Sequence, residues 1–159
     1  MSTRASGGRP RVLIVDDEPE TCVLLRAILE EEGIEVAGAA GGGIQGVFMA
    51  DDLAPDVVLM DLRMPDMDGV QATRRIKAAH PDMQVIFLTF YGDRDWADSA
   101  EDVGAFCYLV KGCPPSMIVE MIRRAWGYQR HKEADPWPTA ADSTGPRPAP
   151  EGSAGLASG

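Results

Sequence analysis

Histidine and cysteine are scarce in this chain of 159 residues, which has only two histidines and three cysteines. None of them has the spacing of a Cys/His metal site. The odd number of cysteines also excludes a framework in which every thiol is paired in a disulfide. We interpret Cys22, Cys107 and Cys113 as reduced thiols of a cytoplasmic protein.

Basic residues and long apolar runs are also few. The 15 Lys and Arg are outnumbered by 25 Asp and Glu, which gives a net charge of −10. Proteins that bind nucleic acid directly use a basic face to displace counterions, so we expect no such binding here. No apolar run approaches the ~20 residues of a membrane-spanning helix, and the start of the chain lacks the apolar segment of a secretory signal. We therefore expect a cytoplasmic protein that does not associate with membranes.

The composition divides the chain into segments. Residues 1–10 are rich in small and polar side chains, and residues 132–159 are mostly Pro, Gly, Ser and Ala. Such segments bury too little apolar surface to offset the entropy of ordering them. The sequence predicts a flexible N-terminus at 1–10, one folded domain at 11–131 and a disordered tail at 132–159.

Within the predicted domain, short apolar runs alternate five times with segments of helical periodicity. The expected strands are 11–15, 34–39, 57–60, 85–88 and 106–110. The expected helices are 19–33, 44–53, 68–79, 93–103 and a last one that carries the apolar residues 118, 121, 122, 125 and 126. This alternation predicts an α/β fold with a five-stranded parallel sheet and helices on both faces.

Polar side chains follow four of the five predicted strands directly. These residues are Asp16, Asp17, Asp61, Thr89 and Lys111. Carboxyl ends of parallel strands meet at one edge of a sheet, so we expect the five side chains to share a shallow pocket. Three carboxylates that lie close together repel one another, and a hard cation such as Mg²⁺ relieves that repulsion. An ammonium and a hydroxyl beside them suit a phosphoryl group, which predicts phosphoryl transfer onto Asp61.

These five positions, together with the run DLRMPDMDG at 61–69, closely resemble the receiver domain of two-component response regulators. The resemblance covers roughly residues 10–131. It implies a (βα)5 flavodoxin-like fold and phosphorylation of Asp61 by a sensor histidine kinase or a phosphotransfer protein. It also implies Mg²⁺ bound directly by Asp17, Asp61 and the backbone carbonyl of Arg63, with Asp16 acting through water.

The resemblance assigns further roles within the domain. Thr89 and Lys111 would act with Asp61 as catalytic residues by contacting the phosphoryl oxygens. Tyr108 matches the aromatic switch residue, which turns inward when Thr89 shifts towards the phosphate. The domain would not be an enzyme beyond self-catalysed phosphotransfer and autodephosphorylation. Its output would pass in trans to a partner protein or through a phosphorylation-dependent homodimer.

Two positions depart from the family pattern. Phe90 follows Thr89, where a small residue is usual, and could restrict access to Asp61. Gly112 follows Lys111, where proline with a cis peptide bond is usual, so Lys111 would be held less rigidly. Arg63 and Tyr91, each two residues beyond a site residue, stand where the family tunes dephosphorylation. Their long and aromatic side chains predict a slowly decaying phosphate.

Three alternatives remain beside this interpretation. The run GGGIQG at 41–46 matches the dinucleotide fingerprint G-x-G-x-x-G, but it follows the second strand, and too little sheet remains for a second mononucleotide half. We interpret the glycines as a loose turn before a mobile helix. Phosphatases of the haloacid-dehalogenase type need a second Asp where this chain has Arg63. Finally, Phe90 and Gly112 are compatible with an interaction module that works without phosphorylation.

Overall fold

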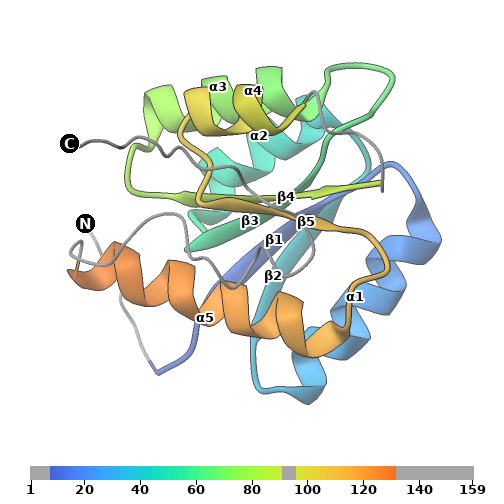
Figure 1. Cartoon of the computed structure of the whole chain (residues 1–159), viewed down its shortest axis with the longest axis vertical. Helices are drawn as coiled ribbons and strands as arrows, with labels where there is room; N and C mark the ends of the chain where they lie inside the picture. Colours follow the sequence, from blue (N-terminus) through green and yellow to red (C-terminus); the bar gives the residue numbers. More distant parts are fainter. Residues whose placement is uncertain (1–7, 91–95, 132–159) are drawn as a thin grey trace, which may run out of the picture.

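Strands and helices alternate along the described residues, 8–90 and 96–131, of the computed structural model (Figure 1). The elements are β1 (Arg11–Val15), α1 (Pro19–Glu31), β2 (Glu35–Ala40), α2 (Gly43–Leu53), β3 (Val57–Asp61), α3 (Gly69–Ala79), β4 (Gln84–Thr89), α4 (Trp96–Asp102), β5 (Cys107–Val110) and α5 (Pro115–His131). The strands form one parallel sheet in the order β2-β1-β3-β4-β5. This architecture confirms the predicted α/β fold.

Apolar residues cover both faces of the sheet, because consecutive side chains of a strand point to opposite sides. In β1, Val12 and Ile14 pack with α1 and α5, whereas Leu13 and Val15 pack towards α2, α3 and α4. The same alternation runs through β3 and β4, whose residues are all buried. Figure 1 shows α1 and α5 on one face of the sheet and the other three helices on the opposite face. The two hydrophobic layers hold the central strands rigidly in place.

The register of the central strands determines which residues meet at the carboxyl edge. Val15 of β1 pairs with Met60 of β3, so the next residues along the chain, Asp16 and Asp61, end neighbouring strands. On the other side of β3, Asp61 pairs with Leu88 of β4. The predicted site residues therefore lie at the ends of adjacent strands of one sheet.

Some boundaries differ from the sequence prediction. The second strand begins at Glu35 rather than Ile34, because the Ile34 amide donates a hydrogen bond to Leu29 O and closes the end of α1. Gly33 adopts φ +79° at that turn, which favours glycine. The fourth helix is described over Trp96–Asp102, and its predicted start at residue 93 lies outside the described part of the chain.

The interpretation of the glycine run as a loose turn is wrong. A Cβ on Gly43 would collide with the Met67 carbonyl oxygen, and one on Gly46 would lie 2.8 Å from Val15 Cγ1. Both approaches are closer than real Cβ contacts, so glycine is required by close packing. The start of α2 is pressed against β1 and against the loop that follows β3.

Among the described residues, no helix has both the length and the apolar character needed to cross a membrane.

Candidate functional site

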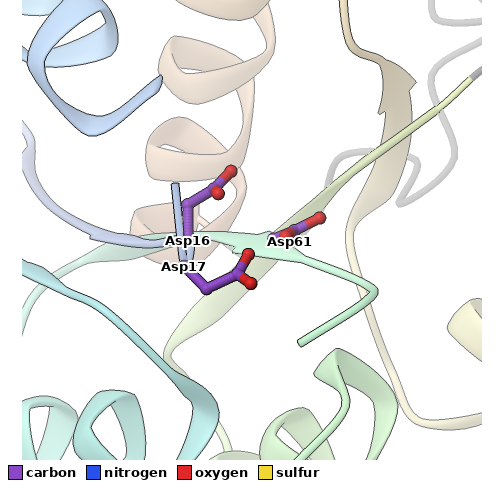
Figure 2. A group of neighbouring side chains, drawn as sticks. All are labelled: Asp16, Asp17 and Asp61. Atoms are coloured by element: carbon purple, nitrogen blue, oxygen red, sulfur yellow. The ribbon is translucent and has the colours of Figure 1, made fainter. Parts of the chain in front are cut away.

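Three carboxylates gather at the carboxyl edge of the sheet. Asp16 and Asp17 follow β1, and Asp61 is the last residue of β3 (Figure 2). One oxygen of each lies within 4.8 Å of the others. Asp16 and Asp61 are buried, whereas Asp17 is exposed. The sheet therefore brings together the three aspartates that the sequence placed at its strand ends.

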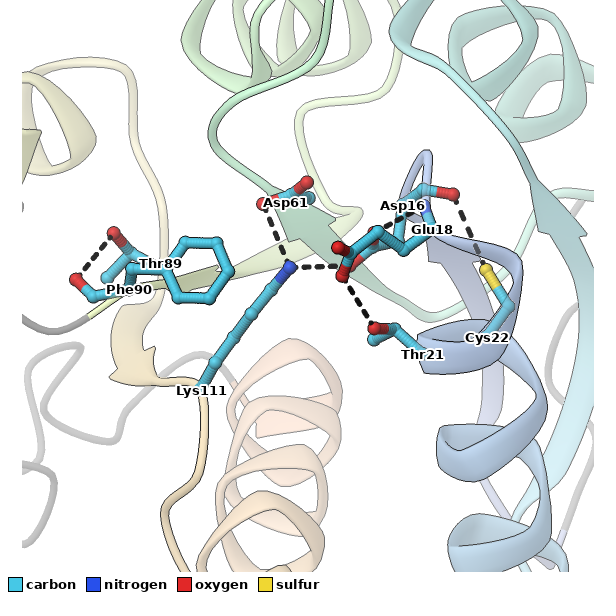
Figure 3. Close-up of polar contacts among 8 residues, drawn as sticks. All are labelled: Asp16, Glu18, Thr21, Cys22, Asp61, Thr89, Phe90 and Lys111. Atoms are coloured by element: carbon cyan, nitrogen blue, oxygen red, sulfur yellow. Dashed lines mark hydrogen bonds and ion pairs between the residues drawn. The ribbon is translucent and has the colours of Figure 1, made fainter.

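Lys111 lies between two of these aspartates. Its Nζ is 2.9 Å from Asp16 Oδ2 and 3.3 Å from Asp61 Oδ1, and its side chain reaches the pair from the loop after β5 (Figure 3). Burial alone would lower the pKa of the Lys111 ammonium, but the contacts with Asp16 and Asp61 outweigh burial and raise it. The ammonium is therefore charged at neutral pH and partly neutralises the acidic cluster.

The Asp61 carboxyl lies where its negative charge is disfavoured. Burial, and then the neighbouring Asp16 carboxylate, raise the pKa of Asp61 to about 6, although Lys111 and a backbone hydrogen bond from Arg63 oppose the rise. Only 4% of the residue is exposed to solvent. At neutral pH the group is mostly ionised, so it can act as a nucleophile, while an added cation would stabilise its charge.

Asp16 is fixed from two sides. Its Oδ1 accepts a hydrogen bond of 2.9 Å from the Glu18 amide, and its own amide donates to the Ala40 carbonyl at 3.0 Å. The Cys22 thiol donates to the Asp16 carbonyl at 3.5 Å. The sequence did not indicate this last contact, because a lone cysteine in a helix has no distinguishing pattern. Burial and the Asp16 charge raise the pKa of the thiol, so Cys22 is protonated at neutral pH.

Thr89 ends β4 and is buried, but its hydroxyl is directed away from the acidic cluster. Its Oγ1 donates to the carbonyl of Phe90 at 3.4 Å, as Figure 3 shows. The Thr89 backbone nevertheless adjoins the cluster, since its carbonyl accepts the Lys111 amide at 2.7 Å. Tyr108 is half-buried in β5, paired in register with Phe87. The structure thus places Thr89 beside the site with its hydroxyl bonded to the neighbouring backbone.

Phe90 covers part of the Lys111 side chain. The ring centroid lies 4.9 Å from Lys111 Nζ, within the range of a cation–π interaction. The residue is 53% exposed, so the ring stands at the rim of the site rather than in the core. Gly112 follows Lys111 with φ +96°, and every peptide bond among the described residues is trans. Tyr91 lies outside the described residues.

The loop at 62–68 follows Asp61 and contains Arg63, which is exposed. The loop closes on itself because the Gly69 amide donates to the Leu62 carbonyl at 2.9 Å. A Cβ on Gly69 would collide with the Asp61 carbonyl oxygen, so this closure requires glycine. The arrangement holds the backbone of Arg63 near the carboxylate that precedes it.

The donor set fits Mg²⁺. Three carboxylates supply hard oxygen ligands, and the exposed Asp17 leaves one side open for water and substrate. No other group of three or more His, Cys, Asp or Glu side chains in the described part of the chain comes this close together. The raised pKa of Asp61 shows that Lys111 does not fully compensate the negative charge of the carboxylates, and a bound cation would supply the positive charge that is missing.

Comparison with known proteins identifies the family. The family described as "Response regulator receiver domain" matches residues 12–123. The chain is 41% identical over 116 residues to the transcriptional regulatory protein LiaR of Bacillus subtilis, covering 72% of this chain and 55% of LiaR. It is 38% identical over 125 residues to the transcriptional regulatory protein PdtaR of Mycobacterium tuberculosis, covering 78% of this chain and 60% of PdtaR. The chain therefore spans a little over half the length of these relatives.

Solved structures agree with this result. A CheY-like receiver domain protein from Methanospirillum hungatei superimposes with a TM-score of 0.73 at 27% identity, covering 79% of this chain and 99% of that one. A receiver domain protein from Clostridium thermocellum gives a TM-score of 0.73 at 32% identity, covering 77% and 98%. The matched segment includes Asp16, Asp17, Asp61, Thr89 and Lys111. This chain belongs to the receiver domain family of two-component response regulators.

Proposed function

We propose that the protein accepts a phosphoryl group on Asp61 from a sensor histidine kinase or a phosphotransfer protein. The observation that carries this proposal is the position of Asp61, a buried carboxylate at the end of the central strand. Two further aspartates lie within 4.8 Å, and the Lys111 ammonium lies at 3.3 Å. A carboxylate oxygen of Asp61 attacks phosphorus, the bond from phosphorus to the donor nitrogen breaks, and an acyl phosphate forms.

The neighbouring residues have separate tasks in this reaction. Lys111 supplies a fixed positive charge for the phosphoryl oxygens, and its ion pair with Asp16 keeps its side chain extended into the site. Mg²⁺, held by Asp16, Asp17, Asp61 and the backbone of Arg63, would supply charge neutralisation for the incoming phosphate. Thr89 would turn its hydroxyl from the Phe90 carbonyl towards the new phosphoryl oxygens.

The switch follows from that movement. Thr89 leaves space at the end of β4 when its hydroxyl turns to the phosphate, and Tyr108 on the next strand moves inward. This change shifts a pre-existing equilibrium in the face formed by α4, β5 and α5. Output then passes in trans to a partner protein, or through a homodimer that forms on phosphorylation. We place the protein in the cytoplasm, where such kinases present their phosphohistidine.

Incubation with acetyl phosphate and Mg²⁺ followed by intact-mass measurement tests the reaction. We expect the mass gain of one phosphoryl group in the wild type and none in Asp61→Asn. Asp52→Asn changes an exposed aspartate at the end of α2 and should be modified like the wild type. Omission of Mg²⁺ should abolish the gain. An Asp61→Asn protein that still gains the mass would overturn the assignment.

A second function is favoured by the ring of Phe90. This ring lies 4.9 Å from Lys111 Nζ at the rim of the site and would restrict access to Asp61. The second function, which is an alternative to the first, is a binding module that works without phosphorylation. The same experiment separates the two functions. A wild-type protein that stays unmodified by acetyl phosphate and by a panel of histidine kinases, yet binds its partner with the same affinity as Asp61→Asn, supports the module.

A further inference from the structure

The glycine run at the start of α2 has no role in the phosphoryl-transfer reaction described above, yet it contacts the loop at 62–68. The start of a helix exposes amide groups that attract an anion, which is why such runs bind nucleotide phosphates in other folds. Here the position is filled from within the chain. Asp66 Oδ1 accepts the Gly43 amide at 3.1 Å, and Asp66 Oδ2 accepts the Ile44 amide at 3.2 Å.

The contact between the Asp66 carboxylate and the start of α2 is close and specific. Asp66 Oδ1 also accepts the Met67 amide at 2.8 Å, so one carboxylate joins the loop tip to the helix start. A Cβ on Gly42 would lie 2.9 Å from Asp66 Oδ2, and one on Gly43 would collide with the Met67 backbone. The hydrogen bond from Ile44, followed by those from Gly43 and Met67, lowers the pKa of Asp66, so the carboxylate stays ionised at neutral pH.

We propose that Asp66 is a positioning residue for the Mg²⁺ site, because it ties the loop that carries Arg63 to the first turn of α2. The inference rests on the proposed function. The loop is otherwise anchored by the buried Leu62 and Met64 and by the hydrogen bond that closes it at Gly69. Pro65 and Asp66 at its tip are exposed and have no apolar anchor of that kind.

Arg63 lies between the two buried anchors, Leu62 and Met64, and two residues before Pro65. Release of the tip therefore reaches the Arg63 carbonyl through the backbone of Met64, which joins it to Pro65 and Asp66. Residues that orient a metal ligand without touching the metal typically change its affinity by tenfold or more when they are replaced. Asp66 itself is exposed and is not among the three clustered aspartates. Its effect on the metal therefore passes through the backbone of the loop.

Calorimetric titration of the full chain with Mg²⁺ alone tests this inference near neutral pH. Asp66→Ala should raise the Mg²⁺ Kd on the order of tenfold, and Asp66→Asn, which keeps one carbonyl oxygen, should restore part of the affinity. Gly43→Ala should raise the Kd as well, because its Cβ displaces the loop from the other side. These variants act on the same contact from its two partners.

Two controls separate positioning from general weakening of α2. Gln45→Ala removes the acceptor of the Gly41 amide in the same turn without touching the loop, and Gly41→Ala adds a Cβ that meets Gln45 Oε1 at 3.8 Å, an ordinary van der Waals contact. Both should keep the wild-type Kd. An unchanged Kd in Asp66→Ala and Gly43→Ala, or an equal rise in Gln45→Ala, would overturn the positioning role. A wild type that binds no Mg²⁺ would instead refute the metal site itself, and with it the inference.

Discussion

At the scale of single residues, Asp61 is a carboxylate whose surroundings disfavour its negative charge. It is buried beside Asp16, and the Lys111 ammonium offsets only part of the resulting cost, so its pKa rises to about 6. A carboxyl in this state is a capable nucleophile at neutral pH, yet it destabilises the fold when nothing neutralises it. Function and stability are therefore in opposition at this residue.

The raised pKa of Asp61 predicts that Asp61→Asn changes the stability of the fold in a pH-dependent way in the absence of Mg²⁺. The folded pKa of about 6 exceeds an unfolded value of ~3.9, so between these pH values the folded chain binds more protons than the unfolded chain. The stability contributed by Asp61 accordingly falls as the pH rises through this window. We expect Asp61→Asn to be more stable than the wild type by about 1 kcal/mol near neutral pH, and equally stable near pH ~4.

Urea unfolding in EDTA at the two pH values measures this difference. Asp52→Asn, at an exposed site, is the control and should leave the free energy of unfolding unchanged at both. A loss of stability in Asp61→Asn near neutral pH would mean that the attraction to Lys111 exceeds the cost of burial, which is the opposite of the expected balance.

Phe90 predicts a kinetic effect. Its ring lies over Lys111 at the rim of the site, so replacement by alanine opens one side of the pocket. We expect Phe90→Ala to accelerate phosphorylation by acetyl phosphate severalfold without changing the modified residue. Phe48→Ala removes an equally large ring that is 69% exposed on α2 and should leave the rate unchanged. A slower reaction in Phe90→Ala would show that the ring helps to hold Lys111 in place.

At the scale of elements, the site depends on how β3 passes into α3. Asp68 is the N-cap of α3, with extended backbone (φ −70°, ψ 166°), and its side chain accepts the Gln71 amide at 2.9 Å. Gly69 permits the close return of the chain to Asp61. The helix start and the loop closure are therefore neighbours in sequence and in space.

Removal of the cap should weaken α3 without altering the acidic cluster. We expect Asp68→Ala to lower the free energy of unfolding by about 1 kcal/mol and Asp68→Ser to lower it much less, because serine also caps helices. Denaturant unfolding in EDTA provides the measurement. Equal stability of the alanine variant and the wild type would mean that the Gln71 amide finds water at no cost.

Much of this architecture could be predicted from the sequence, because its signals are local. The run ending at Asp61 is entirely apolar before the carboxylate, and Pro65 with Asp68 marks where the next helix can begin. The contact of Asp66 with α2 could not be predicted, since its partners are 22 and 23 residues away and an exposed Asp in a turn has many uses. The close packing of the glycine run could not be predicted for the same reason, because its packing partners lie on other elements.

The side-chain geometry of the site was only partly accessible. Strand ends placed Asp16, Asp61 and Lys111 together, because register and parallel pairing follow from the fold. The orientation of Thr89 towards the Phe90 carbonyl depends on a rotamer, which the strand pattern does not determine. The cation–π contact between Phe90 and Lys111 likewise depends on the turn after β4.

At the scale of the whole molecule, the rigid sheet holds the site at one edge while the surrounding loops and helices remain available for change. The central strands are buried on both faces, and the site residues stand in the segments that follow them. Under the proposed function, such a design would let a single covalent change at Asp61 bias the packing of outer elements without unfolding the core. The proposed output face on α4, β5 and α5 lies at the β5 side of the sheet.

The lifetime of the phosphorylated state is a property of this whole arrangement. Arg63 and Tyr91 are expected to impede the attacking water, although Tyr91 lies outside the described residues. We expect the phosphoryl group of the purified phosphoprotein to have a lifetime much longer than seconds. Arg63→Ala should shorten that lifetime. Decay followed by the loss of the phosphoryl mass provides the test, with Arg74→Ala as a control on the exposed side of α3. A lifetime of seconds in the wild type would contradict the expectation.

The decisive experiment is to locate the phosphoryl group in the intact protein. The wild type is phosphorylated in the presence of Mg²⁺, reduced with borohydride to trap the acyl phosphate, and digested for peptide mass spectrometry. We predict that Asp61 is the single reduced residue, and that no residue is reduced when Mg²⁺ is withheld. Reduction of Asp16, Asp17 or another residue would show that Asp61 is not the acceptor. The absence of any reduced residue after incubation with a cognate kinase would show the same.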